Sequence, residues 1–318
     1  MGPDKGEDMG ELEAIERIAA LLPAPPAGQT WIGDDAAVLP APSGSLLFAT
    51  DAVVAGVHVD LSLVGVDDLG WKALAVNVSD VAAMGGRPLA AVVAVTGPPA
   101  ADLEGLYAGL RQAAADYDCP VVGGDLANAS DVVVSVAVLG TTDGRPPVLR
   151  SGARPGHGVF VTGPLGASAA GLRALRAGAH NPAEAIDAHR RPAARVKEGL
   201  AVSEGGGSAM IDVSDGMAID LGRLADASSV GIALELVPLG AGATLEDALG
   251  GGEDYELLFC APDDRAAARF AERGLRPPVR IGVCTPQAGQ LTLDGKPLRR
   301  SGFEHRFGRL RRGRRRSG

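Results

Sequence analysis

Residues 77–86, NVSDVAAMGG, decide how the rest of the chain is interpreted. They continue a run of small apolar residues that predicts a buried helix over about 67–84, ended by the two glycines. Three polar side chains, Asn77, Ser79 and Asp80, nevertheless fall in the middle of that helix. Because burying a carboxylate without a partner costs several kcal/mol, an ionised aspartate at position 80 requires compensation from elsewhere in the molecule.

Further acids lie in similar apolar surroundings. Asp34 and Asp35 occur in IGDDAAVLP, Asp51 in LLFATDAVV, Asp125 in VVGGDLA, and Asp212 and Asp215 in MIDVSDG. Basic residues near these motifs are few, chiefly Lys72, Arg87 and Arg150. Burying so many unpaired carboxylates would exceed the whole stability of a domain, roughly 5–15 kcal/mol. Carboxylate, hydroxyl and carbonyl oxygens suit Mg²⁺, so we predict that these acids converge on a magnesium cluster shared with phosphate groups.

Local structure offers an alternative for each aspartate taken singly, because Asp in Gly and Ser contexts caps helices and shapes turns. Residues 209–226, AMIDVSDGMAIDLGRLAD, predict a strand that runs into a helix. We expect Ser214 to cap that helix, and Asp212 and Asp215 to share one face of its start. The echo between NVSDVAAMGG and DVSDGMAIDLG favours a duplicated βα plan with one copy per domain, although chance explains matches this short equally well.

The length of 318 residues predicts two domains. The turn-rich segment 141–158 marks the boundary, which gives an N-terminal domain at 1–148 and a C-terminal domain at 149–305. Beyond them, residues 306–318 form a basic tail that we expect to be disordered. The pattern also predicts helices over 11–22 and 100–116, strands within 45–61 and over 89–96 and 131–142, and an Asp-Gly hairpin turn in QLTLDGKPL.

The charge is unevenly distributed. Residues 306–318 carry seven arginines and no acid, so removing them from the net charge of −9 leaves −16 on residues 1–305. Such an acidic body repels nucleic acid and suits a protein that gathers cations. The three cysteines lack metal-ligand spacing, and neither a membrane span nor a signal peptide is recognisable, so we expect a cytoplasmic protein without a membrane partner.

The motifs that are missing narrow the chemistry. The sequence has no GxxxxGK[ST], no GxGxxG after a strand, no HExxH, no CxxC and no GxSxG. None of the five histidines has a context typical of a catalytic triad. A reaction whose acceptor is already ionised needs no such base, and phosphoryl transfer to a phosphate oxygen is one of these reactions.

Eight motifs, in this order, carry a specific likeness to one family: IGDDAAVLP, ATDAVVAGVH, KALAVNVSDVAAMGG, VVGGD, LRSGARPGH, VTGPLGASAAGL, IDVSDGMAIDLG and GGEDYEL. From about residue 30 to 305 the chain resembles the thiamine-monophosphate kinase family, within the aminoimidazole ribonucleotide synthetase superfamily. The resemblance implies an α+β fold of two domains, with N-terminal sheets that pair across a homodimer and an α/β C-terminal domain. It also implies ATP-dependent conversion of thiamine monophosphate to thiamine pyrophosphate with Mg²⁺, in a cleft between the domains.

The resemblance also assigns residues to roles. The implied Mg²⁺ ligands are Asp35, Thr50, Asp51, Asp80, Asp125, Asp212 and Asp215, with the carbonyl of Ala49. The implied nucleotide contacts are Tyr117, Gly124, Arg150 and Ser214, and the implied thiamine phosphate contacts are His58, Glu253 and Phe303. Of these, Asp80, Asp125, Asp215 and Arg150 are the expected catalytic residues. The residues alone leave Tyr117 and Phe303 open as core aromatics, whereas an acidic Glu253 and an aromatic ring suit a cationic thiazolium.

Other functions remain open. A sister kinase or synthetase of the same superfamily is the nearest alternative, but selenide-water dikinase uses a reactive residue near its N-terminus, and no cysteine precedes Cys119. The hydrogenase-maturation relative ends in a cysteine-bearing tail, whereas this chain ends in arginine and glycine. A metal-dependent phosphatase would release free phosphate from ATP, and a non-catalytic cation-binding protein would bind Mg²⁺ without nucleotide.

Overall fold

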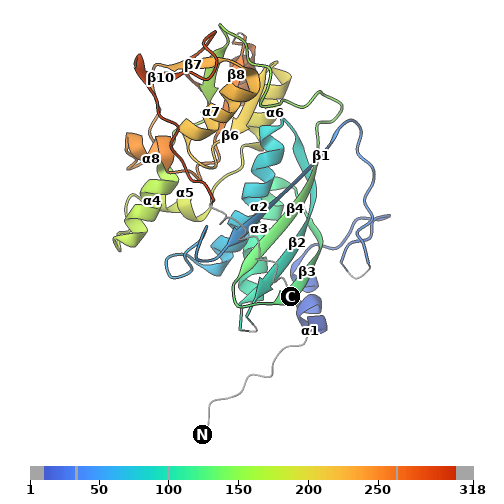
Figure 1. Cartoon of the computed structure of the whole chain (residues 1–318). Coiled ribbons are helices and arrows are strands. Elements are labelled where there is room, and N and C mark those ends of the chain that lie inside the picture. The colour runs from blue at the N-terminus through green and yellow to red at the C-terminus, as the bar shows by residue number, and fades with distance from the viewer. Residues whose placement is uncertain (1–10, 33–34, 99, 263, 306–318) are drawn as a thin grey trace, which may run out of the picture.

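The computed structural model describes residues 11–32, 35–98, 100–262 and 264–305. Their helices and strands form two domains, one around a four-stranded sheet and one around a seven-stranded sheet (Figure 1). The predicted α+β fold of two domains is confirmed. The basic segment 306–318 and Asp34 lie outside the described residues. Within the described ranges, no helix combines the length and the apolar character needed to cross a membrane.

The N-terminal domain packs helices on one face of its sheet. Its elements are α1 (Glu11–Leu21), β1 (Leu46–Val54), α2 (Val66–Ala83), β2 (Arg87–Gly97), α3 (Leu103–Tyr117), β3 (Val121–Asn128) and β4 (Val133–Thr141). The strand order is β1-β4-β2-β3, with β2 and β3 parallel and the other pairs antiparallel. Leu74 of α2 and Leu110 of α3 join Val93 and Val136 of the sheet in one core. On the opposite face Phe48 is 72% exposed and Val92 is 41% exposed.

Helix α2 agrees with the predicted helix over about 67–84. Asp68 in its first turn accepts the N–H of Gly65 at 3.3 Å, which satisfies one of the donors that a helix start leaves free. The helix stops at Met84, and Gly85 follows with φ of 69°, a left-handed conformation that glycine adopts without strain. Thirteen residues of α2 are buried, including Asn77 and Ser79, because it lies between the sheet and the C-terminal domain (Figure 1).

The C-terminal domain builds a larger mixed sheet. Its elements are β5 (Gly158–Val161), α4 (Ala167–Arg176), α5 (Ala183–Arg190), α6 (Val196–Glu204), β6 (Ala209–Asp212), α7 (Met217–Ser228), β7 (Gly231–Leu234), α8 (Leu245–Gly250), β8 (Leu257–Ala261), α9 (Arg265–Glu272), β9 (Val279–Thr285), β10 (Leu291–Leu293) and β11 (Lys296–Pro297). The strand order is β11-β10-β7-β9-β5-β8-β6. Asp294 and Gly295 both have positive φ between β10 and β11, which confirms the predicted hairpin turn.

The start of α7 differs from the sequence prediction. The helix begins at Met217 with Gly216 as its N-cap, so the expectation that Ser214 caps it is wrong. Asp212 is the last residue of β6 and Asp215 lies in the loop, so they do not share a helix face. A carboxylate inside the helix replaces the cap, because Oδ2 of Asp220 accepts the N–H groups of residues 214, 215 and 216 at 3.0–3.2 Å.

The two Val-Ser-Asp motifs occupy different structures. Residues 78–80 lie inside α2, whereas residues 213–215 lie between β6 and α7. The predicted duplicated βα plan is therefore wrong at these motifs. The two copies meet across the domain boundary instead, because the hydroxyl of Ser79 donates to Oδ2 of Asp212 at 2.7 Å.

Close backbone packing joins the domains. A Cβ on Gly199 of α6 would lie 2.2 Å from the carbonyl oxygen of Ala82 in α2, a separation that only glycine permits. Arg191 pairs with Asp67 and Asp68 at the start of α2, at 2.6 Å each. These contacts fix α2 against the C-terminal domain at both of its ends.

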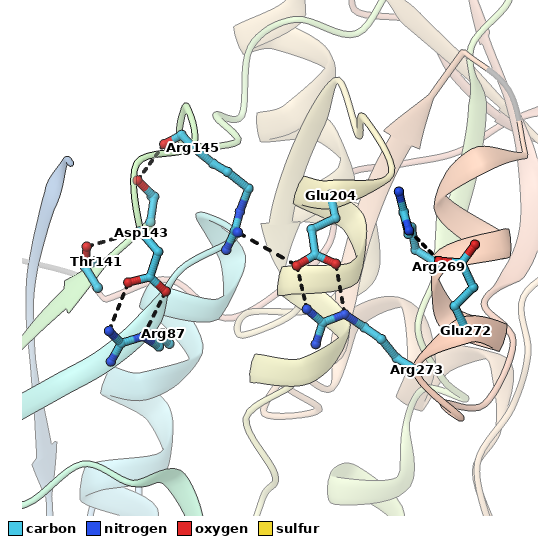
Figure 2. A network of polar contacts seen from close by, with 9 residues as sticks. Arg87, Thr141, Asp143, Arg145, Glu204, Arg269, Glu272 and Arg273 are labelled. Atoms are coloured by element: carbon cyan, nitrogen blue, oxygen red, sulfur yellow. Dashed lines mark hydrogen bonds and ion pairs between the residues drawn. The ribbon is translucent and has the colours of Figure 1, made fainter. Parts of the chain in front are cut away.

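A surface network adds to this connection (Figure 2). Glu204 of α6 forms an ion pair with Arg273. It also lies 3.8 Å from Arg145, which belongs to the segment between the domains. Arg87 at the start of β2 pairs with Asp143 at 2.9 Å. Arg87 is therefore engaged at the surface and does not balance the acids of the NVSDVAAMGG region.

We expect Gly199→Val to lower the free energy of unfolding by about 3 kcal/mol, because the added side chain pushes α6 away from the α2 backbone. Urea denaturation followed by circular dichroism measures this change. Lys197→Val is the matched control, because it places the same β-branched residue at an exposed position of the same helix. Equal losses in the two variants would show that the contact between α6 and α2 is not the cause.

Candidate active site

Carboxylates from both domains meet at the end of the cleft beside α2. Asp80 projects from α2, Asp51 from β1, and Asp212 and Asp215 from the end of β6 and the loop after it. The pKa of Asp80 is raised to about 7, chiefly by burial and then by the charges of Asp212 and Asp51, while the charge of Arg150 opposes the shift. Asp51 is exposed at its surface, but partial loss of solvent around its carboxylate raises its pKa, with added repulsion from Asp212 and Asp215. These acids are therefore close enough to repel one another.

Asp212 is the most buried acid of the cluster, with 4% of its surface exposed. Burial raises its pKa, whereas the hydrogen bond from Ser79 and the charge of Arg150 lower it. Ser79 and Arg150 thus offset part of the cost of burying Asp212, and Arg150 also acts on Asp80. The carboxylates of the cluster present hard oxygen atoms to the cleft.

The polar residues of α2 position this cluster. Oδ1 of Asn77 accepts the N–H of Asp51 at 2.7 Å, and Nδ2 of Asn77 donates to the carbonyl of Ala73 at 2.9 Å. Ser79 holds Asp212 from the other domain. Asn77 and Ser79 point to different sides of α2, so the helix fixes a strand of the N-terminal sheet on one side and a strand of the C-terminal sheet on the other, with Asp80 next to Ser79 in sequence.

A cavity of about 320 Å³ opens beside these acids. Its lining combines apolar and charged groups: Leu46, Leu47, Phe48, Ala49, Asp80, Val81, Ala83, Met84, Arg150, Met210 and Ile211. Arg150 is exposed, and its guanidinium presents several donors in a planar fork that matches phosphate oxygens. The cavity therefore offers apolar walls, one acid and one arginine between the two domains.

Asp215 has a partner that the sequence reasoning missed. Nη1 of Arg223 lies 2.5 Å from Oδ2 of Asp215 and 2.6 Å from Oδ1 of Asp220. The available signal was the i, i+3 spacing of Asp220 and Arg223 on α7. Ser214 lies in the same loop and is partly buried.

The residues expected to contact thiamine phosphate gather beside the same cleft. Nδ1 of His58 accepts the N–H of Val54 at 3.0 Å, and Nε2 lies 3.2 Å from Nε2 of His305. The ring of Phe303 packs edge-on at 6.4 Å from that of His58, and its main-chain N–H donates to the carbonyl of Asp215 at 2.9 Å. Burial lowers the pKa of His58, and the charges of His305 and Lys72 lower it further while Glu253 opposes the shift.

Four expected residues lie apart from this cluster or are engaged elsewhere. Thr50 donates its hydroxyl to the carbonyl of Val136 at 2.8 Å, and Asp35 is exposed. The hydroxyl of Tyr117 accepts the N–H of Ala194 at 3.0 Å, and burial raises its pKa to about 12.

Asp125 is the fourth and lies on β3, at the sheet edge opposite β1. Asp51 of β1 aligns with Val136, then Val93, then Gly124 of β3. Three interstrand spacings amount to roughly 14 Å, so the fold of one chain keeps Asp51 and Asp125 apart. A Cβ at Gly124 would lie 1.9 Å from the carbonyl oxygen of Val93, which explains the glycine there.

The described acidic, histidine and cysteine side chains include no group of three or more arranged to hold a metal ion. The carboxylate oxygens of Asp51, Asp80 and Asp212 are hard ligands of the kind that Mg²⁺ takes together with waters and phosphate oxygens. Zn²⁺ more often takes cysteine and histidine ligands, which this set does not include.

Family models match both domains of the chain. The N-terminal domain of the AIR synthase related proteins matches residues 33–142, and their C-terminal domain matches residues 154–294. Thiamine-monophosphate kinase of Mycobacterium tuberculosis is 37% identical over 270 residues, which cover 80% of this chain and 81% of that protein. The protein of the same name from Aquifex aeolicus is 36% identical over 318 residues, which cover 94% and 99%.

Solved structures agree with these sequence matches. Thiamine-monophosphate kinase from Stenotrophomonas maltophilia K279a superposes with a TM-score of 0.78 at 32% identity, covering 91% of this chain and 98% of that one. AaThiL complexed with AMPPCP and TMP superposes with a TM-score of 0.75 at 34% identity, covering 96% and 100%. The shared fold, both family models and the extent of sequence identity show that this chain belongs to the thiamine-monophosphate kinase family.

Proposed function

We propose that this protein transfers the γ-phosphoryl group of ATP to the phosphate of thiamine monophosphate and so forms thiamine pyrophosphate. The observation that carries the proposal is the meeting of Asp51, Asp80 and Asp212 with Arg150 beside one cavity between the domains. Family membership supports the choice of substrates, because a related structure holds AMPPCP and TMP. The three free cysteines fit a reducing compartment, and we assign the reaction to the cytoplasm.

The proposed transfer is direct. A phosphate oxygen of thiamine monophosphate forms a bond to the γ-phosphorus as the bond to the β,γ-bridging oxygen breaks, and ADP leaves. The attacking oxygen is already ionised, so the chain needs no general base. Two polyanions must approach each other, and Arg150 lowers that barrier by pairing with phosphate oxygens. The remaining task of the chain is to align the two substrates and to exclude water from the cleft.

The carboxylates fit Mg²⁺. Asp51, Asp80 and Asp212 supply oxygen ligands whose mutual repulsion a divalent cation would relieve, and we assign Asp215 and the Ala49 carbonyl to the same set. When bound, Mg²⁺ neutralises and orients the phosphate oxygens. Asn77 and Ser79 hold two of these carboxylates in place before any ligand binds. Ser214, Gly124 and Tyr117 are the proposed nucleotide contacts.

We assign the thiamine end of the substrate to Glu253, His58 and Phe303. Glu253 is 24% exposed and Phe303 is 45% exposed, so both can reach a ligand in the cleft. The thiazolium ring is cationic, and a carboxylate with an adjacent aromatic ring would stabilise it. His58 lies between β1 and Phe303, because its Nδ1 accepts the N–H of Val54 and its ring packs against that of Phe303.

The proposed site requires a homodimer. Asp125 and Gly124 lie on the sheet edge opposite Asp51, so a single chain does not supply all of the proposed ligands. Pairing β3 of one protomer with β1 of its partner would bring an Asp125 beside an Asp51. The exposed Phe48 and Val92 support this arrangement, because a second sheet would cover them.

We expect Asp80→Asn to abolish thiamine pyrophosphate formation, because a neutral amide no longer supplies an anionic Mg²⁺ ligand. A product assay with ATP, Mg²⁺ and either thiamine or thiamine monophosphate measures the activity of wild type and variant. Asp226→Asn is the matched control, since Asp226 forms an exposed ion pair with Arg300 outside the cleft. Phosphate release from ATP that is independent of thiamine monophosphate would identify a phosphatase, and near-normal activity of Asp80→Asn would reject its assigned role.

The same variant should stabilise the protein when Mg²⁺ is chelated. Asp80 has a folded-state pKa of about 7 against an ordinary 3.8, so the folded protein holds an unfavourable charge once the pH exceeds 7. The stability given by the protonated form is present at low pH and is lost as the pH rises through 7. Chemical denaturation should give Asp80→Asn a gain that is about 2 kcal/mol larger at pH 8 than at pH 5. A pH-independent gain would contradict the buried-charge explanation.

Mixing two inactive variants tests the shared site. If each site takes Asp51 from one protomer and Asp125 from its partner, then Asp51→Asn and Asp125→Asn subunits form mixed dimers with one intact site. Random exchange should restore about a quarter of the wild-type activity. No recovery, with mixed dimers demonstrated by mass spectrometry of differently tagged subunits, would show that one chain supplies both residues.

A further inference from the structure

Lys72 is a buried charge that the proposed chemistry leaves unexplained. It lies on α2 and is 2% exposed, and it is among the largest of the fully buried side chains described. A lysine ammonium is stable in such a place only if it is paired with an acid. Its partner comes from the other domain, because Nζ lies 3.0 Å from Oε1 of Glu253.

Glu253 is held at several points. Its backbone has a φ of 59°, which is uncommon for a residue other than glycine, and its N–H donates to the carbonyl of Ser214 at 2.7 Å. Its second carboxylate oxygen, Oε2, lies 3.5 Å from Nδ1 of His189. The carboxylate is thus fixed through both oxygens while part of it remains open to the cleft.

Lys72 is the positive partner of this carboxylate. His189 is buried, and burial with the charge of Lys72 lowers its pKa to about 4, so it is neutral at physiological pH. Nδ1 of His189 also lies 3.2 Å from the hydroxyl of Ser168, which holds the ring in place. Glu253 also interacts electrostatically with Tyr255 and with His58, whose pKa is lowered chiefly by burial. A neutral histidine can orient the carboxylate, but only the lysine balances its charge.

We propose that Lys72 is a positioning residue for the thiamine monophosphate site. It holds the Glu253 carboxylate in one orientation toward the cationic end of the substrate. This role rests on the proposed function. Lys72 is too deeply buried to touch the substrate, so it acts through Glu253 alone. The pair also fixes the position of Glu253, in the C-terminal domain, relative to α2, the helix that carries Asp80.

Loss of Lys72 should weaken the binding of thiamine monophosphate and not that of ATP. Without Lys72, the carboxylate loses its charge partner and turns toward water, so the acid no longer faces the thiamine end. On the nucleotide side, Glu253 reaches Ser214 through its main-chain N–H, and that hydrogen bond does not depend on the charge of either side chain of the pair. An interaction that is equally strong in the ground state and the transition state changes KM and leaves kcat unchanged.

Steady-state kinetics on the full-length protein tests the proposal, with thiamine monophosphate and ATP varied separately. We expect Lys72→Met to raise KM for thiamine monophosphate about tenfold, with KM for ATP and kcat changed by less than about twofold. Arg191→Met is the matched control, because it removes another ion pair between α2 and the C-terminal domain without touching Glu253. It should lower thermal stability and leave the ratio of the two KM values unchanged.

A double-mutant cycle separates positioning from a general structural role. On a Glu253→Gln background, Lys72→Met should change KM for thiamine monophosphate by less than about twofold, because the group that it positions is already neutral. This comparison does not need Lys72→Met alone to fold, because the double variant buries no unpaired charge, and in Glu253→Gln the buried Lys72 can lose its charge by deprotonation. Additive effects, or equal increases in both KM values, would overturn the proposal. If wild type makes no thiamine pyrophosphate, the proposed function fails, whereas an active wild type with an unchanged Lys72→Met refutes only the role of Lys72.

Discussion

Repulsion among Asp51, Asp80 and Asp212 is the constraint on which the rest of this structure depends. Three carboxylates from three elements are held at one end of a cleft, and the pKa of each is raised, first by loss of solvent and then by the charges of neighbouring acids. A protein stable by roughly 5–15 kcal/mol tolerates this cost only if other contacts hold the acids in place. In the proposed function, this concentration of negative charge attracts cations and cation-bound phosphates to the cleft.

Helix α2 supplies those contacts. It is part of the N-terminal domain in sequence, but it also packs against the C-terminal domain. Its Asn77 fixes β1, its Ser79 fixes the end of β6, and its Lys72 pairs with Glu253. The close approach of Gly199 to Ala82 leaves little freedom for α6 to move away. Asn77 therefore connects the helix to its own sheet, whereas Ser79 and Lys72 connect it to the C-terminal domain, and each of these three buried polar residues has a partner.

The N-terminal sheet divides the proposed ligands between its two edges. Asp51 and the cavity lie beside β1, whereas Gly124 and Asp125 lie on β3 across the sheet. An apolar face and two unpaired edges are costly for an isolated chain, and a second copy would satisfy both. In the proposed dimer, the requirement to cover the sheet and the requirement to complete the site have the same solution.

The sequence by itself determined the family, the two-domain α+β fold and most elements, because hydrophobic periodicity and turn residues act locally. Thus α2, the Asp294-Gly295 hairpin and the acid-rich motifs were all predictable. Local patterns were misleading where a distant side chain intervened, as when Asp220 replaced Ser214 in capping α7 and Arg87 paired with Asp143. Only the tertiary structure decided which acids meet, that Arg223 pairs with Asp215 and Lys72 with Glu253, and that Asp125 lies at the far edge. The physical reason is that charge balance in a cleft is set by domain packing between residues distant in sequence, which no local periodicity encodes.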